Sequence, residues 1–321
     1  MRAMPGHAQR LKLPYIYMQG LLNIDQNDEQ LYTQAVKAKA DDKTISPMFL
    51  IAQTLPLLIH VLADRECPIL PLGTVNTRNT FKIHRPKLAR DISALRTASE
   101  ESKLSYRVYF GGFDRPGYRR KRGVEFCISV DVLFGEDIIV TQELWVLQFL
   151  TKSFEPRYIP DGGEQDQRAL EDHVGDGGSH TIRLATSDPH KWAASTKDYN
   201  RIHVSHLGAK IFGFKSVIAH GNHLVALATE CLRDDIAKDQ DSPSSKARQM
   251  WWEGTKPIIL EARFIRPTTL PAESHIAWRD SGNSDSGVRF TMSSRGKVCI
   301  SGSLIHDDTQ IPMKAITSPI E

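Results

Sequence analysis

The chain has 321 residues, of which 40% are hydrophobic and 25% charged, as is ordinary for a globular protein with a hydrophobic core. Its length predicts about two domains, and its net charge of +3 is too small to indicate a nucleic-acid partner. The four cysteines are scattered without a C-x-x-C pair, which favours reduced thiols over a disulfide framework or a zinc site. We expect a cytoplasmic protein, since we see no signal peptide and no apolar stretch long enough to span a bilayer.

The first half opens with polar sequence and then a long apolar segment. Residues 13–20 have the pattern of an edge strand, and residues 29–40 have moderate helical character. Ser46-Pro47 is typical of a helix start, with an N-cap residue followed by proline at the first helical position. The helix that follows is apolar on nearly every side, which predicts that it is buried. Pro56 is expected to kink or break it.

After this helix the pattern becomes strand-like, with valine, isoleucine and aromatic residues alternating with polar ones. The strands are predicted at residues 69–75, 77–84, 103–110, 123–134 and 137–149. One buried helix followed by several antiparallel strands indicates an α+β domain over residues 1–154. Proline, glycine and acidic residues then dominate residues 155–180, which predicts a linker.

The second half, residues 181–321, repeats the same plan. A strand at 180–186 precedes a short helix that starts at Asp188-Pro189 and reaches about Ser195. A central helix is predicted from Gly221 to about Asp239, followed by a polar loop. Strands are then predicted at residues 256–265, 275–280, 287–293 and 297–306. Two such halves in one chain are expected to pair edge to edge as a pseudo-dimer, because the pairing covers sheet edges that would otherwise be exposed.

The residues that indicate chemistry lie between these elements. Asp198, Asn200 and His203 fall within six residues, and His220-Gly221 lies at the start of the second central helix. A carboxylate and an imidazole this close can form an acid/base pair that activates a water. The Gly221 N–H lies at the positive end of a helix, where an oxygen that becomes anionic is stabilised. The alternative is that Asp198 and Asn200 cap a loop and His203 is structural.

The spacing D-x-N-x-x-H, then Ala209, G-F and I-A-H-G, resembles the MaoC-like dehydratases, a hotdog-fold family that includes R-specific enoyl-CoA hydratases. The resemblance is specific from about residue 188 to 271 and implies a double hotdog. It implies that Asp198 and His203 activate a water, Asn200 fixes the loop, and the Gly221 amide binds the thioester oxygen. Thr229 and His220 would be supporting residues. The first half has no such motif, so one active site is expected in each pseudo-dimer.

The chain also departs from the family pattern beside the motif. Lys197 replaces the usual glycine, Arg201 the usual proline, and Asn222-His223 follows the H-G pair in place of an apolar residue. The two added cations are placed to reach a substrate phosphate. Other candidates for binding the phosphates of coenzyme A or an acidic carrier protein are Arg119, Arg120 and Arg122 in a basic turn, and Arg266. The alternative for the basic turn is a solvated hairpin tip.

These features together predict a double hotdog hydratase/dehydratase that acts on an acyl thioester of coenzyme A or acyl carrier protein. No cofactor and no metal site are expected, and further homodimerisation is left open. Two other functions are compatible with the fold: a non-catalytic acyl-thioester-binding protein and a hotdog thioesterase. A thioesterase would attack the carbonyl carbon instead of the β-carbon, and the D-x-N-x-x-H motif argues against it.

Overall fold

A computed structural model describes residues 13–39, 43–69, 74–112, 117–120, 123–149, 178–233, 240–281 and 287–308, with the side chains of Arg119 and Arg120 outside this description. Within these residues, 11 strands form one antiparallel sheet in the order β1-β3-β5-β6-β2-β8-β11-β10-β9-β7, with β4 paired to β5. The strands of the first half are β1 (Ile16–Leu21), β2 (Thr74–Ile83), β3 (Leu104–Phe110), β4 (Tyr118–Arg120), β5 (Gly123–Phe134) and β6 (Asp137–Phe149). Those of the second half are β7 (Ser179–Leu184), β8 (Ile258–Phe264), β9 (Ala272–Asp280), β10 (Gly287–Ser294) and β11 (Lys297–His306).

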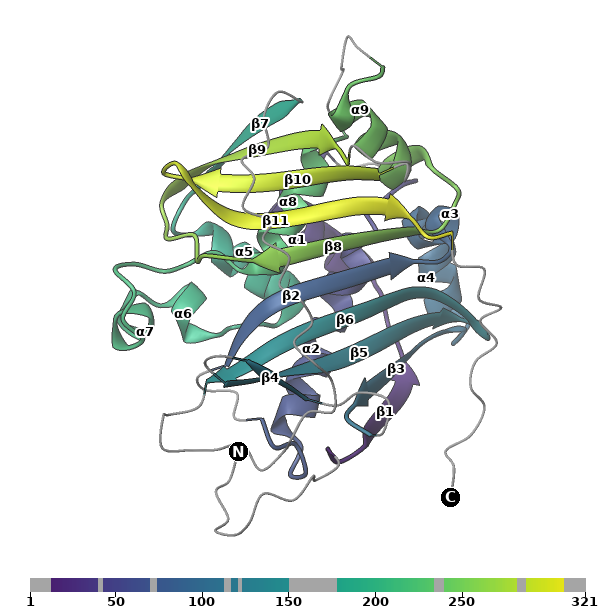
Figure 1. Cartoon of the computed structure of the whole chain (residues 1–321). Helices are drawn as coiled ribbons and strands as arrows, with labels where there is room; N and C mark the ends of the chain where they lie inside the picture. The colour runs from purple at the N-terminus through teal and green to yellow at the C-terminus, as the bar shows by residue number, and fades with distance from the viewer. Residues whose placement is uncertain are drawn as a thin grey trace.

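The two halves meet where β2 pairs with β8. Six residue pairs join these strands, from Arg78 opposite Arg263 to Ile83 opposite Ile258. The sheet therefore runs without a break from β1 in the first half to β7 in the second (Figure 1). The predicted edge-to-edge pairing is confirmed, and each half covers one edge of the other.

The central helices, α2 and α8, lie behind the sheet in the view of Figure 1, together with α1 and α5. This arrangement confirms the predicted double hotdog, in which each half of the sheet wraps one buried helix. The helices of the first half are α1 (Gln26–Val36), α2 (Met48–Ala63), α3 (Pro86–Arg90) and α4 (Ile92–Glu100). Those of the second are α5 (Asp188–Thr196), α6 (Arg201–Val204), α7 (His206–Ile211), α8 (Gly221–Cys231), α9 (Pro243–Arg248) and the π-helix η1 (Gln249–Glu253). No helix among the described residues is long and apolar enough to cross a membrane.

Several local predictions were wrong. The strand predicted at 77–84 and the end of the one predicted at 69–75 form one strand, β2, whose pairing with β6 shifts between Asn76 and Arg78; residues 70–73 lie outside the described residues. Helix α2 runs through Pro56, so the predicted break there is wrong, while the predicted kink stays a prediction. The polar segment predicted as a loop after the second central helix contains the start of α9, because the Ser242 hydroxyl accepts a hydrogen bond from the Ser245 N–H and caps this helix. The two helices α3 and α4 were not predicted at all.

Two boundaries also differ from the sequence prediction. Helix α8 ends at Cys231, eight residues before the predicted end, and residues 234–239 lie outside the described residues. The predicted linker also falls mostly outside them, since residues 150–177 are not described, and β7 already begins at Ser179. The domain boundaries therefore stay predictions.

The two halves share one hydrophobic core. Phe49 and Tyr32 come from the first half and Trp192 from the second, and all three are fully buried in the same cluster. The Tyr32 ring lies 5.5 Å from that of Phe49 and 6.3 Å from that of Trp192. Because the Tyr32–Trp192 contact crosses from one half to the other, packing in this cluster joins the two halves.

Candidate active site

The D-x-N-x-x-H segment begins with a left-handed turn after α5. Lys197 ends this helix with φ 58°, a conformation that glycine adopts most easily. Its ammonium group donates to the Ala194 carbonyl at 2.7 Å and so folds back onto α5. The next residue, Asp198, is half-buried, and its carboxylate accepts the Asn200 N–H at 3.2 Å. The Asn200 side chain in turn accepts the Ile202 N–H at 3.4 Å and caps α6.

His203 lies on α6 with its two ring nitrogens in different environments. Its Nδ1 is 2.8 Å from the Ile218 carbonyl oxygen. Because a carbonyl only accepts hydrogen bonds, we assign the proton to Nδ1, which leaves a lone pair on Nε2. Burial lowers the pKa of His203, against the opposing effects of the Ile218 carbonyl and Asp198. The neutral ring is therefore favoured at neutral pH and can accept a proton.

The fold brings His220 against this pair. A carboxylate oxygen of Asp198 and one ring nitrogen each of His203 and His220 all lie within 4.8 Å of one another. The rings of His203 and His220 stack, with centroids 3.7 Å apart and an interplanar angle of 27°. Nearly parallel rings do not direct their nitrogen lone pairs to one point, so the group suits a shared water better than a metal ion. A separation of this size can be bridged by a single water.

His220 itself is buried and held as a neutral ring. Its Nε2 lies 3.2 Å from the Asp198 main-chain carbonyl oxygen and 3.7 Å from Oδ2 of the same residue. Burial puts the pKa of His220 well below its usual value, and the neighbouring imidazoles of His203 and His223 lower it further. Since Nε2 donates to a carbonyl, the ring is fixed against Asp198 and forms one wall of the site. This contact supports a scaffold role for His220.

Gly221 begins α8 directly after His220, so the N-terminus of this helix lies beside the stacked rings. The first N–H groups of a helix have no acceptor inside the helix, and the macrodipole is positive there. A Cβ atom on Gly221 would lie 2.5 Å from Cε1 of Phe264 on β8. Only glycine therefore fits this position without displacing the aromatic ring.

The first half of the chain holds the beginning of α8 through two buried hydrogen bonds. Asn79 on β2 donates its amide to the side-chain oxygen of Asn222. His223 Nε2 donates to the Ala35 carbonyl of α1 at 2.8 Å, and its ring stacks on that of Trp192 with centroids 5.0 Å apart. Asn222 and His223, the two residues that depart from the family pattern after the H-G pair, thus link the second half of the chain to the first through hydrogen bonds. Asn79 was missed by sequence reasoning, since no local pattern links a strand amide to a helix 143 residues away.

We expect Asn79→Ala to lower stability by about 1–3 kcal/mol, because it leaves the buried Asn222 amide unpaired. Since α8 then loses one of its two anchors, kcat is expected to fall more than KM changes. The double variant Asn79→Val/Asn222→Leu removes both polar partners, and it should recover part of the stability. Thermal unfolding and steady-state kinetics of Asn79→Val, Asn222→Leu and the double variant measure this coupling. Strictly additive losses in the double variant would contradict it.

Burial also makes stability depend on pH. The pKa of His223 is lowered from 6.5 to about 4, chiefly by desolvation. Below pH 6.5 the unfolded chain therefore binds a proton that the folded chain excludes, and stability falls as pH drops towards 4. Lowering the pH from 7 to 5 therefore reduces the free energy of unfolding by about 2 kcal/mol through His223 alone. Burial likewise lowers the pKa of His84 to about 4, so this residue also reduces the stability of the folded chain over the same range of pH.

Urea unfolding at pH 7 and pH 5 measures this loss directly. His223→Phe removes the titrating ring, so the difference in unfolding free energy between the two pH values should shrink. His275→Phe, at an exposed position in β9, is the matched control and should leave the difference as in the wild type. An unchanged pH dependence in His223→Phe would show that this residue is not the source.

The remaining predicted site residues either make other contacts or lie outside the described residues. The Thr229 hydroxyl donates to the Ala226 carbonyl of its own helix at 2.9 Å. The Arg266 guanidinium donates to the Val298 carbonyl at 2.8 Å, and Arg201 is exposed at the start of α6. Arg119 and Arg120 lie on β4, but their side chains are outside the structural description. Arg122 lies wholly outside the described residues. Their roles stay predictions.

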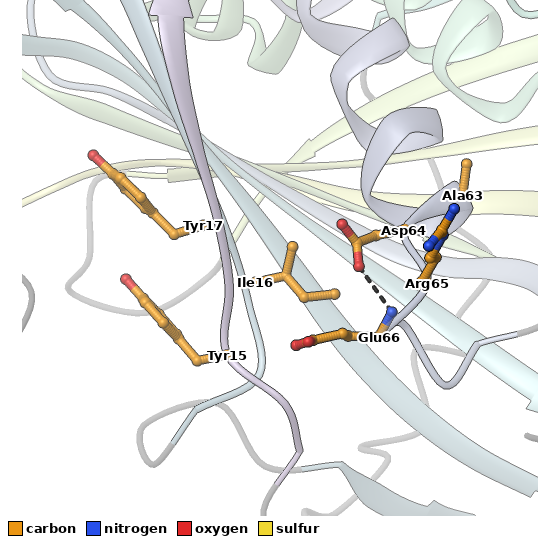
Figure 2. Close-up of a pocket in the computed structure, with 7 residues that line it drawn as sticks. All are labelled: Tyr15, Ile16, Tyr17, Ala63, Asp64, Arg65 and Glu66. Atoms are coloured by element: carbon orange, nitrogen blue, oxygen red, sulfur yellow. Dashed lines mark hydrogen bonds between the residues drawn. The ribbon is translucent and has the colours of Figure 1, made fainter.

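A surface hollow of about 560 Å³ lies elsewhere, between β1 and the end of α2 (Figure 2). Its lining residues are Tyr15, Ile16, Tyr17, Ala63, Asp64, Arg65 and Glu66. The Asp64 carboxylate accepts the Glu66 N–H at 2.8 Å in its floor. None of these residues belongs to the D-x-N-x-x-H segment, so the hollow is not part of the candidate active site.

The sequence and the fold both resemble those of known proteins. The chain is 24% identical over 235 residues to 3-hydroxyacyl-thioester dehydratase X of Mycobacterium tuberculosis, which covers 72% of this chain and 69% of that protein. The crystal structure of HtdX from the same organism matches 92% of this chain and all of that chain, with a TM-score of 0.62 and 18% identity. A MaoC-like dehydratase from Phytophthora capsici matches 92% of this chain and 96% of that chain, with a TM-score of 0.56 and 14% identity.

No family model matches the chain. The fold is nevertheless shared with these structures over more than nine-tenths of the chain. The D-x-N-x-x-H segment precedes the second central helix, with α7 between them. By fold and by these likenesses, the chain is similar to the MaoC-like dehydratases.

Proposed function

We propose that the protein is a hydratase/dehydratase that interconverts a trans-2-enoyl thioester and an (R)-3-hydroxyacyl thioester. The observation that carries this proposal is the placement of Asp198 and His203 within reach of one water, beside the N-terminus of α8. The likeness to a protein named 3-hydroxyacyl-thioester dehydratase X supports the same reaction class. The Asp/His pair supplies proton transfer, and the helix N-terminus supplies an oxyanion site.

In the hydration direction, His203 Nε2 accepts a proton from the water as the water oxygen bonds to the β-carbon of the enoyl group. The Asp198 carboxylate accepts a hydrogen bond from the second O–H of the same water, which stays bonded to its oxygen, and so orients the water. The electron pair of the double bond moves towards the thioester oxygen, which the Gly221 N–H stabilises by several kcal/mol as negative charge develops. The His203 imidazolium then gives its proton to the α-carbon, which restores the neutral ring as the carbonyl re-forms. Dehydration is the reverse sequence.

The rate should depend on pH through His203, because only the neutral ring accepts a proton. Burial lowers the pKa of this ring, so the neutral form persists below the usual histidine range. In the hydration direction kcat is therefore expected to stay constant from neutral pH down to mildly acidic pH, and to fall only as the pH drops through the lowered pKa.

Hydration of crotonyl-CoA, followed by loss of enoyl-thioester absorbance, tests the proposal directly. Chiral analysis of the product should show the (R)-3-hydroxyacyl thioester. Release of free thiol without hydration would instead identify a thioesterase. Binding of the thioester without either product would identify a non-catalytic acyl-thioester-binding protein.

Coenzyme A or acyl carrier protein is the proposed carrier of the acyl group. Lys197, Arg201 and Arg266, together with the basic turn of Arg119, Arg120 and Arg122, are the proposed phosphate-binding residues. Charge reversal of Arg119, Arg120 and Arg122 together should raise KM with little change in kcat, if these side chains bind phosphate in both ground state and transition state.

A further inference from the structure

Helices α6 and α7 project from the body of the molecule beside the candidate active site (Figure 1). We call residues 199–216, which contain both helices, the α7 lobe. It begins one residue after Asp198, and its first helix carries His203. A macromolecule that delivers a substrate to His203 must therefore stand beside this lobe.

The outer face of the α7 lobe is unusually apolar. Leu207 is 70% exposed and Ile211 73% exposed, which makes them the most exposed large apolar side chains among the described residues. They are four positions apart on α7 and so share one helix face. Tyr199 and Phe212 are also exposed, at 57% and 47%. Grouped apolar exposure of this kind marks an interaction surface more often than isolated residues do.

The opposite face of α7 is firmly packed, so the apolar residues are turned outward by a fixed backbone. Ala209 is fully buried, and a Cβ atom on Gly208 would lie 2.6 Å from Cβ of Arg201. The Ser205 hydroxyl caps the helix by accepting the Gly208 N–H at 3.1 Å. A surface held in place before binding loses little conformational entropy when a partner docks.

The charge of the α7 lobe has a single sign. The sequence contains no aspartate or glutamate between residues 199 and 229. Arg201, Lys210 and Lys215 lie in the lobe and are exposed. The charged residues of the lobe itself are therefore all cations, and their electrostatic field favours an anionic partner.

We propose that the α7 lobe is the docking surface for an acidic acyl carrier protein that brings the thioester to His203. This proposal rests on the proposed function and adds the partner and its site. An acidic protein with an apolar patch matches both the cations and the apolar face. A second copy placed lobe to lobe would instead bring like charges together, and free coenzyme A has no large apolar surface to cover Leu207 and Ile211.

The test compares crotonyl-CoA with a purified bacterial acyl carrier protein loaded with a crotonyl group. Two double variants change the lobe without touching the proposed catalytic or phosphate-binding residues: Lys210→Glu/Lys215→Glu and Leu207→Ser/Ile211→Ser. For each, kcat/KM with the crotonyl carrier protein should fall about tenfold or more, while kcat/KM with crotonyl-CoA stays within about twofold of the wild type. For the wild type, the carrier-protein value should also decrease with salt, since the screening length is about 8 Å at physiological ionic strength.

Control variants make the same kinds of substitution at positions outside the lobe. Lys87→Glu alters an exposed lysine on α3, and Ile59→Ser an exposed apolar residue on α2. Both should behave as wild type with either substrate. Biolayer interferometry with immobilised holo acyl carrier protein measures docking without turnover, so the lobe can be tested even if the proposed reaction fails. There, wild type and controls should bind and the lobe variants should not.

Three results would overturn the proposal. The first is an equal loss with both substrates in folded lobe variants, which would show that the lobe only supports the dyad. The second is crotonyl-CoA hydration by the wild type without carrier-protein binding or turnover, which would leave the proposed function intact. The third is lobe-dependent self-association in analytical ultracentrifugation, or lobe-dependent binding to phosphatidylglycerol vesicles, with no carrier binding.

Discussion

Asp198→Asn and His203→Ala should each lower kcat for crotonyl-CoA hydration by about 10²–10⁴, the range for loss of a general acid or base. Asp198→Asn removes the carboxylate but keeps the size of the side chain, so the hydrogen bond from the Asn200 N–H can persist. His203→Ala removes the Nε2 lone pair and also the contact with the Ile218 carbonyl. The effects should be far from additive in the double variant, because the two groups act on one water.

A matched control separates chemistry from structure. His206→Ala removes an exposed imidazole three residues further along, whose Nδ1 lies 3.4 Å from the Ser216 hydroxyl. It should keep nearly wild-type turnover, and all variants should unfold at similar temperatures. Near-wild-type rates in both Asp198→Asn and His203→Ala would refute the proposed mechanism.

Residues 178–321 expressed alone should fail to form a soluble, active protein. Six residue pairs between β2 and β8 would be lost, which exposes β8 as a bare edge strand prone to aggregation. The hydrogen bonds from Asn79 to Asn222 and from His223 to Ala35 would be lost as well. The buried Trp192 would also lose Tyr32, its neighbour from the first half. Solubility and crotonyl-CoA hydration measure the outcome.

Co-expression provides the control for this truncation. Residues 1–149 supplied as a separate chain should restore solubility and activity to residues 178–321, because the interface does not require a covalent link. Shortening residues 161–178 within the full chain should also be tolerated, since doubling or halving a flexible loop changes stability by only about 0.6 kcal/mol. A stable and fully active isolated second half would contradict the pseudo-dimer.

Much of the fold follows from local patterns in the sequence. The apolar run after Ser46-Pro47 predicts α2, and alternation predicts β3, β5 and β6 to within a residue of their observed bounds. These elements are predictable because the period of apolar residues reports which face is buried. The spacing of Asp198, Asn200 and His203 likewise identifies the candidate site, because these groups are close in sequence and any loop conformation keeps them near one another.

The tertiary structure alone decided how the site is completed. It stacks His220 on His203 and ties Asn222 to Asn79 across 143 residues of sequence. It also turns Leu207 and Ile211 outward while burying Ala209 on the same short helix. No local period encodes the contacts of His220 and Asn222, and the contact of Asn222 with Asn79 arises only when the two halves pair through β2 and β8. Sequence by itself thus determined many of the elements and the spacing of the candidate site residues, and long-range packing determined which groups surround them.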